Sequence, residues 1–511
     1  MTRPRPPLAL VLPAAAAAVI AVTPLWYLLD RTFDRGAGAL VDELWRRRTL
    51  DLVVRSLGLT LAVTALCIVI GLGAAWLVVR SDLPGRRLLR VAFTLPLAIP
   101  SYLSAFAWIS WRPGLAGFGG ATLVLTLVSY PYVMLPAAAA LARLDPAHDD
   151  VARSLGKSRL HVLLRLTLPQ IRSSIAAGAL LVALYVLSDF GAVAAMRYEV
   201  FTWVIYGAYR AGFNPSRAAI LATVLVLLAM VLVVAESRAR GRAAARVGSG
   251  TARRHVPVKL GRATPVAYVF CIAVLAPALA FPIWRILTWV SSYASTDLDL
   301  ADVATALGNT LVLAGLAAVA TVLLAFPTGV LAARSNSRVA RTLERSTYLA
   351  HGLPGIVVAI SLVYVGVRIL EPIYLEVPLL IIGYVVLFIP LAVGAVRASV
   401  EQSPVRLEEV ARSLGDRPSA VVRRVTAPLA APGIAAGAAL VLLATMKELP
   451  VTLVLHPTGT DTLATQLWQY TAVSDYANAG PYALALVLFA AIPTALLGAS
   501  ASRRPKAGVL S

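Results

Sequence analysis

Three charged side chains lie within long apolar stretches and are the first candidates for chemistry: Asp189, Lys447 and Glu448. A charge inside a membrane-length apolar segment is costly in lipid, so such a side chain is expected to face protein or water. If Asp189 and Glu448 face one cavity, the two carboxylates would attract a cation such as Fe³⁺, or an amine. The alternative is structural: Glu448 pairs with Lys447 or an arginine, and Asp189 caps an interrupted helix near Gly191.

Other metal-ligating and catalytic residue types form no constellation in the sequence. The five histidines are scattered, and no pair has the spacing of metal ligands on one helix. Cys67 and Cys271 each lie in an apolar run without a CxxC partner, which is typical of small buried hydrophobic residues. We therefore predict no catalytic residue, no metal site and no cofactor in this chain.

The segments that must position the charged residues are long and apolar. Of 511 residues, 59% are hydrophobic and 14% are charged, and the mean hydropathy is +0.79. A helix needs roughly 20 apolar residues to cross a bilayer core, and it satisfies its own backbone hydrogen bonds in lipid. The sequence predicts an all-α polytopic membrane protein with about twelve spans, at 8–29, 52–79, 90–111, 119–142, 175–196, 216–236, 264–290, 304–332, 347–370, 377–399, 433–455 and 480–500.

Basic residues in the loops set the predicted orientation. The loops after the second and sixth spans, and the C-terminal tail, are rich in arginine and lysine, which places them and both termini in the cytoplasm. The loop 30–51 disagrees, because it would lie outside yet contains Arg46, Arg47 and Arg48. The net charge of +21 is assigned to this topology and to anionic lipid rather than to nucleic acid, since the charges lie between apolar runs.

The two halves of the chain match each other at an offset of 259 residues. Val151–Gly156 recurs unchanged as Val410–Gly415, and Asp189 matches Glu448. Further matches are Pro131 with Pro390, Pro169 with Pro428 and, at an offset of 258, Leu95-Pro96 with Leu353-Pro354. Six spans in each half put both repeated loops on one side of the membrane, as in a parallel repeat. The predicted domains are a lobe at 1–236, a basic cytoplasmic linker at 237–263 and a lobe at 264–511.

The repeated loop is predicted to form a helix, a sharp turn and a second helix. Gly156 and Gly415 interrupt the first helix, because glycine takes the positive φ of a helix C-terminus at little cost. An acid and an arginine three residues apart are expected to meet on one face: Asp150 with Arg153, and Glu409 with Arg412. Pro169 and Pro428 are expected to end the loop before the next span. A plain surface hairpin would fit one copy, but two copies in one register favour docking of a partner protein.

The repeated loop resembles the EAA motif of permeases from binding-protein-dependent ABC importers. That motif reads E-A-A, three residues, G, nine residues, I, one residue and L-P. The first copy has Asp150-Val-Ala152, Gly156, Leu166 and Leu168-Pro169 at these spacings. The second copy has Glu409-Val-Ala411, Gly415, Val425 and Ala427-Pro428. The departures are aspartate for glutamate in the first copy, valine for the middle alanine in both, and alanine for leucine in the second.

The segments Ser188–Ala192, Met446–Pro450 and Asp461–Thr465 resemble those of fused two-lobe permeases of the ferric-iron type, and this resemblance extends over nearly the whole chain. It implies the type I ABC importer permease fold, with two lobes of six spans and with residues 150–160 and 409–419 as coupling helices that dock to an ATPase. The docking residues that it implies are Asp150, Ala152, Arg153, Gly156, Pro169, Glu409, Ala411, Arg412, Gly415 and Pro428.

The same resemblance implies translocation of ferric iron across the inner (plasma) membrane. A periplasmic or lipid-anchored substrate-binding protein would deliver the iron, and two ATPase subunits would bind ATP and Mg²⁺. The chain has no G-x-x-x-x-G-K-[ST] run, so we expect no enzymatic activity of its own. The related thiamine permeases share the two-lobe plan, so a permease for thiamine, or for another small cation or a polyamine, is the alternative. A six-plus-six secondary transporter would explain the spans but not the two docking loops.

Overall fold

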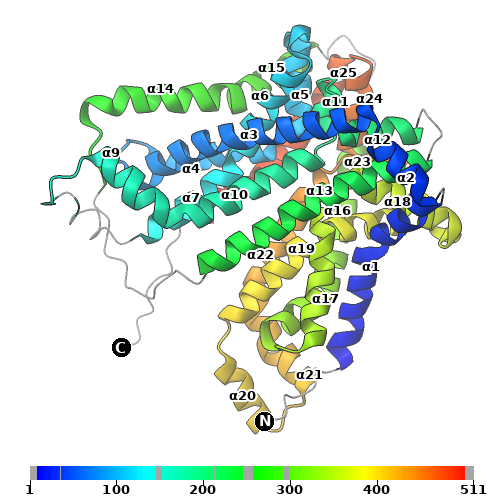
Figure 1. The fold of residues 1–511 in the computed structure, drawn as a ribbon. Coiled ribbons are helices and arrows are strands. Elements are labelled where there is room, and N and C mark those ends of the chain that lie inside the picture. Colours follow the sequence, from blue (N-terminus) through cyan, green and yellow to red (C-terminus); the bar gives the residue numbers. More distant parts are fainter. Residues whose placement is uncertain are drawn as a thin grey trace. The chain divides into compact units, whose positions relative to one another are not determined.

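The computed structural model describes residues 8–34, 36–144, 152, 154–210, 215–244, 257–292 and 300–500, which fold into helices (Figure 1). The helices of the first half are α1 (Leu8–Phe33), α2 (Gly36–Leu44), α3 (Arg47–Arg80), α4 (Arg86–Thr94), α5 (Ser101–Trp111), α6 (Phe118–Ser129), α7 (Pro131–Arg143), α9 (Arg159–Val162), α10 (Leu168–Ser188), α11 (Gly191–Ala195), α12 (Phe201–Arg210) and α13 (Pro215–Ala244). Those of the second half are α14 (Thr264–Leu275), α15 (Phe281–Ser292), α16 (Leu300–Arg334), α17 (Arg338–Leu349), α18 (Gly355–Arg368), α19 (Val377–Gln402), α20 (Val405–Ser413), α21 (Pro418–Val421), α22 (Ala427–Met446), α23 (Pro450–Leu455), α24 (Leu463–Ala472) and α25 (Tyr476–Ser500).

Within the described ranges, ten segments are long and apolar enough to cross a membrane, and two bent helix pairs raise the number to twelve. The ten are Leu8–Phe33, Arg47–Arg80, Phe118–Arg143, Leu163–Ser188, Pro215–Ala235, Gly261–Ser292, Leu300–Arg334, Val377–Gln402, Pro418–Met446 and Tyr476–Ala495. The bent pairs are Arg86–Ala98 with Ser101–Trp111, at 88°, and Arg338–Gly352 with Gly355–Arg368, at 110°. The predicted all-α polytopic fold is confirmed, and every predicted span overlaps one of these segments.

The third span of each half bends at a proline. Pro100 precedes α5 with φ −58° and ψ 146°, and Pro354 precedes α18 with φ −61° and ψ 143°. The residues before both prolines are also extended, because the proline ring disfavours the helical conformation in its predecessor. The two prolines therefore occupy equivalent places. The predicted match of Pro96 with Pro354 is wrong, and Pro100 is the structural counterpart, which changes the offset in this part of the repeat to 254.

The fifth span of each half begins with a short helix and a π turn. These π turns are η3 (Leu163–Thr167) and η9 (Val422–Thr426), which lie 259 residues apart. Pro169 and Pro428 follow at once, as the second residues of α10 and α22. They lie inside the span, so the prediction that they end the loop is wrong. A proline in the first turn after a wider π turn loses little, because its missing amide has no regular helical partner there.

The described helices form two compact units, each with segments from both halves of the sequence. One unit contains residues 1–46, 204–226 and 297–473, and in it α1 packs against α16 and α17. The other contains residues 47–203, 227–296 and 474–511, and in it α14 packs against α3 and α4 while α15 packs against α5. The first helix of each half thus packs with helices of the opposite half, an exchange that the predicted lobes at 1–236 and 264–511 do not include.

The centre of each unit is the same trio of spans, the second, fourth and fifth of a half. These are α3, α7 and α10 in one unit, and α16, α19 and α22 in the other. Glycine allows the close approach: a Cβ on Gly178 would lie 2.8 Å from the Tyr132 carbonyl oxygen, and a Cβ on Gly437 would lie 2.7 Å from the Ala395 Cβ. Small residues at helix contacts are typical of packing inside membranes.

Candidate functional site

The turn of each repeated loop is closed by a glycine. Gly415, which follows α20, has φ +92°, and its counterpart Gly156 has φ +75°. A Cβ on either glycine would meet no atom within 4 Å. Backbone conformation rather than space therefore selects glycine at both positions, and the predicted positive φ is confirmed in both copies.

The same backbone hydrogen bond holds both turns. The Asp416 amide donates to the Ala411 carbonyl at 3.1 Å, and the Lys157 amide donates to the Ala152 carbonyl at 3.1 Å. This bond reaches back five residues and belongs to the Schellman pattern, which satisfies carbonyls left open at a helix end. Ala152 and Ala411 are both buried. The small alanine of the motif thus lies under the turn.

The tip of each turn carries an exposed leucine. Leu155 is 72% exposed and Leu414 is 82% exposed, and the two are 259 residues apart. On α20, Val410 adds further exposed apolar surface. The two copies therefore expose the same large apolar side chain at the same position of the turn.

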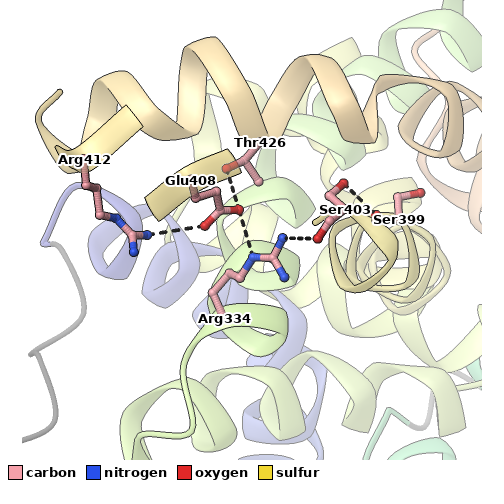
Figure 2. A network of polar contacts seen from close by, with 6 residues as sticks. All are labelled: Arg334, Ser399, Ser403, Glu408, Arg412 and Thr426. Atoms are coloured by element: carbon pink, nitrogen blue, oxygen red, sulfur yellow. Dashed lines mark hydrogen bonds and ion pairs between the residues drawn. The ribbon is translucent and has the colours of Figure 1, made fainter. Parts of the chain in front are cut away.

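The inner face of α20 is held by one carboxylate, that of Glu408 (Figure 2). Its Oε1 accepts hydrogen bonds from Arg334 Nε at 2.9 Å and from Thr426 Oγ1 at 3.0 Å. Its Oε2 accepts from Arg412 Nη2 at 3.3 Å. Glu408 precedes the motif acid by one residue and is buried, whereas Glu409 is exposed.

Arg412 bonds to Glu408, four residues earlier, so the predicted pairing of Glu409 with Arg412 is wrong. The face of α20 that packs on the spans decides the pairing, because it turns the carboxylate of Glu408 inward and that of Glu409 outward. In the first copy, Asp150 and Arg153 lie outside the described residues, so their predicted pairing stays a prediction.

The buried acid of the first half accepts a hydrogen bond on each of its carboxylate oxygens. Asp189 is the residue that ends α10. One of its carboxylate oxygens accepts from the hydroxyl of Ser101, the first residue of α5, and the other accepts from the Ala192 amide at 2.9 Å. Thr202 Oγ1 donates to its carbonyl at 2.7 Å. Asp189 thus joins the start of α11 to the bend of the third span.

The buried acid of the second half has a similar role. Glu448 Oε1 accepts from the Val451 amide, and Oε2 accepts from the amide and the hydroxyl of Thr452, all at 2.9 Å. These donors lie in the first turn of α23, so the carboxylate caps that helix. Lys447, the third predicted residue, is the C-terminal cap of α22.

Both acids lie against the helix that follows the bend inside the third span. Ser101 begins α5 and donates to Asp189, whereas Gly355 begins α18, where a Cβ would lie 3.1 Å from Glu448 Oε1. A serine therefore accompanies the short acid, and a glycine makes room for the long one. These partners were not predicted from the sequence; the match of Pro100 with Pro354, at an offset of 254, indicates them.

The surroundings of Glu448 are rich in hydroxyl groups. A cavity of about 10 Å³ lies beside it, which is room for one water molecule. Its polar lining consists of Glu448, Thr310, Tyr384, Thr445, Thr452 and Thr462. Asp189 belongs to the other compact unit, so a shared cavity for the two carboxylates stays a prediction. In the described part of the chain, no group of three His, Cys, Asp or Glu side chains is placed to hold a metal ion.

The spans, the internal repeat and the paired turns define a multi-pass membrane permease with two homologous parts. The family described as "Binding-protein-dependent transport system inner membrane component" matches residues 67–237 and again 325–503. The chain therefore belongs to this family and carries its domain twice, as a fused two-lobe permease of an ABC importer located in the inner membrane.

Relatives of known name agree with this class. The chain is 35% identical over 497 residues to the Fe(3+)-transport system permease protein FbpB 2 of Haemophilus influenzae, covering 96% of this chain and 98% of the relative. It is 28% identical over 224 residues to the molybdenum transport system permease protein ModB of Escherichia coli, covering 39% and 96%. It is 27% identical over 236 residues to the sulfate transport system permease protein CysW of Synechocystis, covering 42% and 86%.

Proposed function

We propose that this chain is the permease subunit of an ATP-driven importer of ferric iron. The assignment of the substrate rests on the 35% identity, along 96% of the chain, to a relative named for Fe(3+) transport. The molybdenum and sulfate relatives match 39% and 42% of the chain at lower identity. They support the class of transporter more than the choice of substrate.

The partners follow from the two docking turns. Each turn presents an exposed leucine, so two copies of an ATPase subunit bind, one at Leu155 and one at Leu414. ATP and Mg²⁺ belong to these subunits, and the permease itself catalyses no reaction and holds no cofactor. An extracytoplasmic substrate-binding protein, either periplasmic or lipid-anchored, delivers the iron at the outer face.

The orientation follows from the charges. Both docking turns and both termini face the cytoplasm, because the arginine-rich loops lie on the same side as the turns. On that side, the exposed leucines at the tips of the turns meet the ATPase. The buried acids follow the turns in the chain and lie toward the membrane interior.

The experiment is reconstitution of the complete complex in proteoliposomes. The permease is combined with its ATPase subunits and substrate-binding protein, and uptake of radiolabelled Fe³⁺ is measured with and without ATP. We expect uptake that requires both ATP and the binding protein. Thiamine, a polyamine, molybdate and sulfate are added in excess as competitors, and none should reduce the uptake of iron.

The competitors also separate the alternatives. Inhibition by thiamine or a polyamine would replace the iron assignment with a small organic cation while leaving the class intact. Uptake driven by an ion gradient without ATP or ATPase subunits would instead mean a secondary transporter, and would contradict the proposal as a whole.

The docking turns yield a direct prediction. Replacing Leu155 and Leu414 by aspartate should weaken ATPase binding, since each buried leucine contributes about 1.5–3 kcal/mol, or roughly a tenfold to hundredfold change in affinity. Copurification of the ATPase with the permease measures it. The control is Leu300→Asp. Leu300 is an exposed leucine at the first residue of α16, at the end away from Arg334, and its replacement should leave copurification unchanged. Equal loss in the control would argue against docking at the turns.

A further inference from the structure

Glu408 joins three elements of one compact unit at a single carboxylate (Figure 2). Arg334 is the last residue of the span α16, Glu408 lies in α20, and Thr426 is the last residue of the π turn η9 at the start of α22. The Arg334 Nη2 also donates to the Ser403 carbonyl, directly after α19, at 2.9 Å. The end of α16, the coupling helix and the start of α22 are therefore tied together, with the end of α19 alongside.

The contact is largely buried on the Glu408 side, unlike a surface ion pair. The side chain of Glu408 is 4% exposed and that of Arg334 is 18% exposed. Exposed pairs contribute little, but removing one partner of a buried pair leaves an uncompensated charge and is strongly unfavourable. The geometry is also directional, because a charged donor and a hydroxyl converge on the same oxygen. This carboxylate is therefore fixed relative to both spans.

The other compact unit has an arginine and a threonine at the matching places. Arg80 ends α3 as Arg334 ends α16, and it is 3% exposed. Thr167 ends η3 as Thr426 ends η9, and it is 5% exposed. Arginine and threonine thus recur, buried, at the same ends of the same two elements. The sequence position that matches Glu408 is Asp149, which lies outside the described residues.

The span that starts at this contact leads to the buried acid. From Thr426, α22 runs to Met446, and Glu448 follows; from Thr167, α10 runs to Ser188, and Asp189 follows. A π turn at the base of each span is a local irregularity of a kind that is frequent at functional sites. The helix that begins at each π turn, α22 or α10, therefore carries a displacement of the turn to the region of the acid.

We propose that Arg334, Glu408 and Thr426 form a coupling joint, through which movement of α20 is passed to α16 and α22 together. This inference rests on the proposed function, because it assumes that an ATPase moves α20. The three are positioning residues that touch neither ATP nor the transported ion. The carboxylate of Glu408 makes the contacts of the joint on the inner face of α20. Glu409 is exposed on the same helix and can contact the ATPase.

The test uses the complete transporter in proteoliposomes. Glu408→Gln keeps the shape of the side chain and removes its charge. We expect ATPase binding and basal ATP hydrolysis to persist, because Leu414 and Glu409 are unchanged. The amount of Fe³⁺ transported per ATP hydrolysed should fall about tenfold or more, because Arg334 loses its buried partner. Stimulation of ATP hydrolysis by the iron-loaded binding protein should fall with it.

A milder variant and a matched control complete the design. Thr426→Val removes one hydrogen bond to the same oxygen, and the expected loss of transport per ATP is about twofold to tenfold. It carries the test if Glu408→Gln does not fold. The control is Glu401→Gln, which removes an ion pair with Arg397 within α19, at 2.7 Å, that does not involve α20; its transport per ATP should equal that of the wild type. Arg80→Gln should reproduce the loss through the other unit.

The outcomes separate the joint from the proposed function. Unchanged transport per ATP in both Glu408→Gln and Thr426→Val would overturn the joint. Loss of ATPase binding in Glu408→Gln would also overturn it, since the carboxylate would then serve docking rather than transmission. If the wild-type permease fails to bind an ATPase or to transport Fe³⁺ with ATP, the proposed function fails, whatever the variants do.

Discussion

Replacing Gly156 and Gly415 together by valine is expected to abolish ATP-driven uptake. Both glycines have positive φ, at +75° and +92°, and a residue with a Cβ pays roughly 1–2 kcal/mol in the left-handed region. A β-branched residue is more restricted still. The turn would open, α20 would continue or fray, and the exposed leucine at the tip would leave its docking position. Uptake of Fe³⁺ into proteoliposomes measures the effect.

The controls separate the backbone from the added side chain. Asparagine tolerates the left-handed conformation better than other residues, so Gly156→Asn with Gly415→Asn should retain much of the uptake. Gly308→Val places the same side chain on α16 at a glycine that also has open space, without positive φ, and should behave as the wild type. Normal uptake in the double valine variant would contradict the coupling role of the turns.

The turns could be predicted because glycine leaves a direct trace in the sequence. Gly156 and Gly415 end two identical six-residue segments. A glycine that ends a helix is expected to take positive φ, so its position alone predicts the conformation. Which of two adjacent acids on α20 points toward the spans could not be predicted in the same way. Glu408 and Glu409 are adjacent, and the choice between them depends on which face of α20 meets the spans. That face is set by Arg334, which lies 74 residues earlier in the chain.

The spans could be located from hydropathy, but two features of them could not. Pro100 and Pro354 bend the third spans by 88° and 110°, while the apolar composition on either side reads as one continuous helix. The exchange of α1 and α14 between the halves leaves no trace either. Every face of such a helix is apolar, so the pattern cannot distinguish a lipid-facing surface from one that packs on a chosen partner.

The sequence predicts an offset of 259 with one match at 258, whereas the structure has offsets of 254 and 259. The segment before the bends, which contains Arg80 and Arg334, matches at 254, and the segment after them matches at 259. A search at a single offset therefore finds the repeated turns and the buried acids but misses Arg80, Pro100 and their counterparts. The residues missed are those that connect the turns and the acids to neighbouring spans.

The buried acids give the last prediction, in which stability falls more than transport. In Asp189→Asn with Glu448→Gln, each amide keeps one acceptor but turns an NH₂ group toward donors. The donors are the Ser101 hydroxyl and the Ala192 amide around Asp189, and the Val451 amide with the amide and hydroxyl of Thr452 around Glu448. A hydrogen bond to a charged group contributes about 1.5–3 kcal/mol, and loss of a helix cap costs about 0.5–2 kcal/mol. The melting temperature of the purified permease should therefore drop clearly.

Uptake per folded transporter distinguishes a structural role of these acids from a role in the passage of the cation. Both oxygens of each carboxylate already accept hydrogen bonds from helix ends, which favours a structural role for the two acids. We expect uptake per folded complex to stay within about twofold of the wild type, since the amides preserve the shape of the path. Ser101→Ala is the matched variant for Asp189, because it removes one donor and keeps the carboxylate; it should lower the melting temperature in part and leave uptake unchanged. An unchanged melting temperature with lost uptake in the double variant would instead place the two carboxylates on the route of the cation.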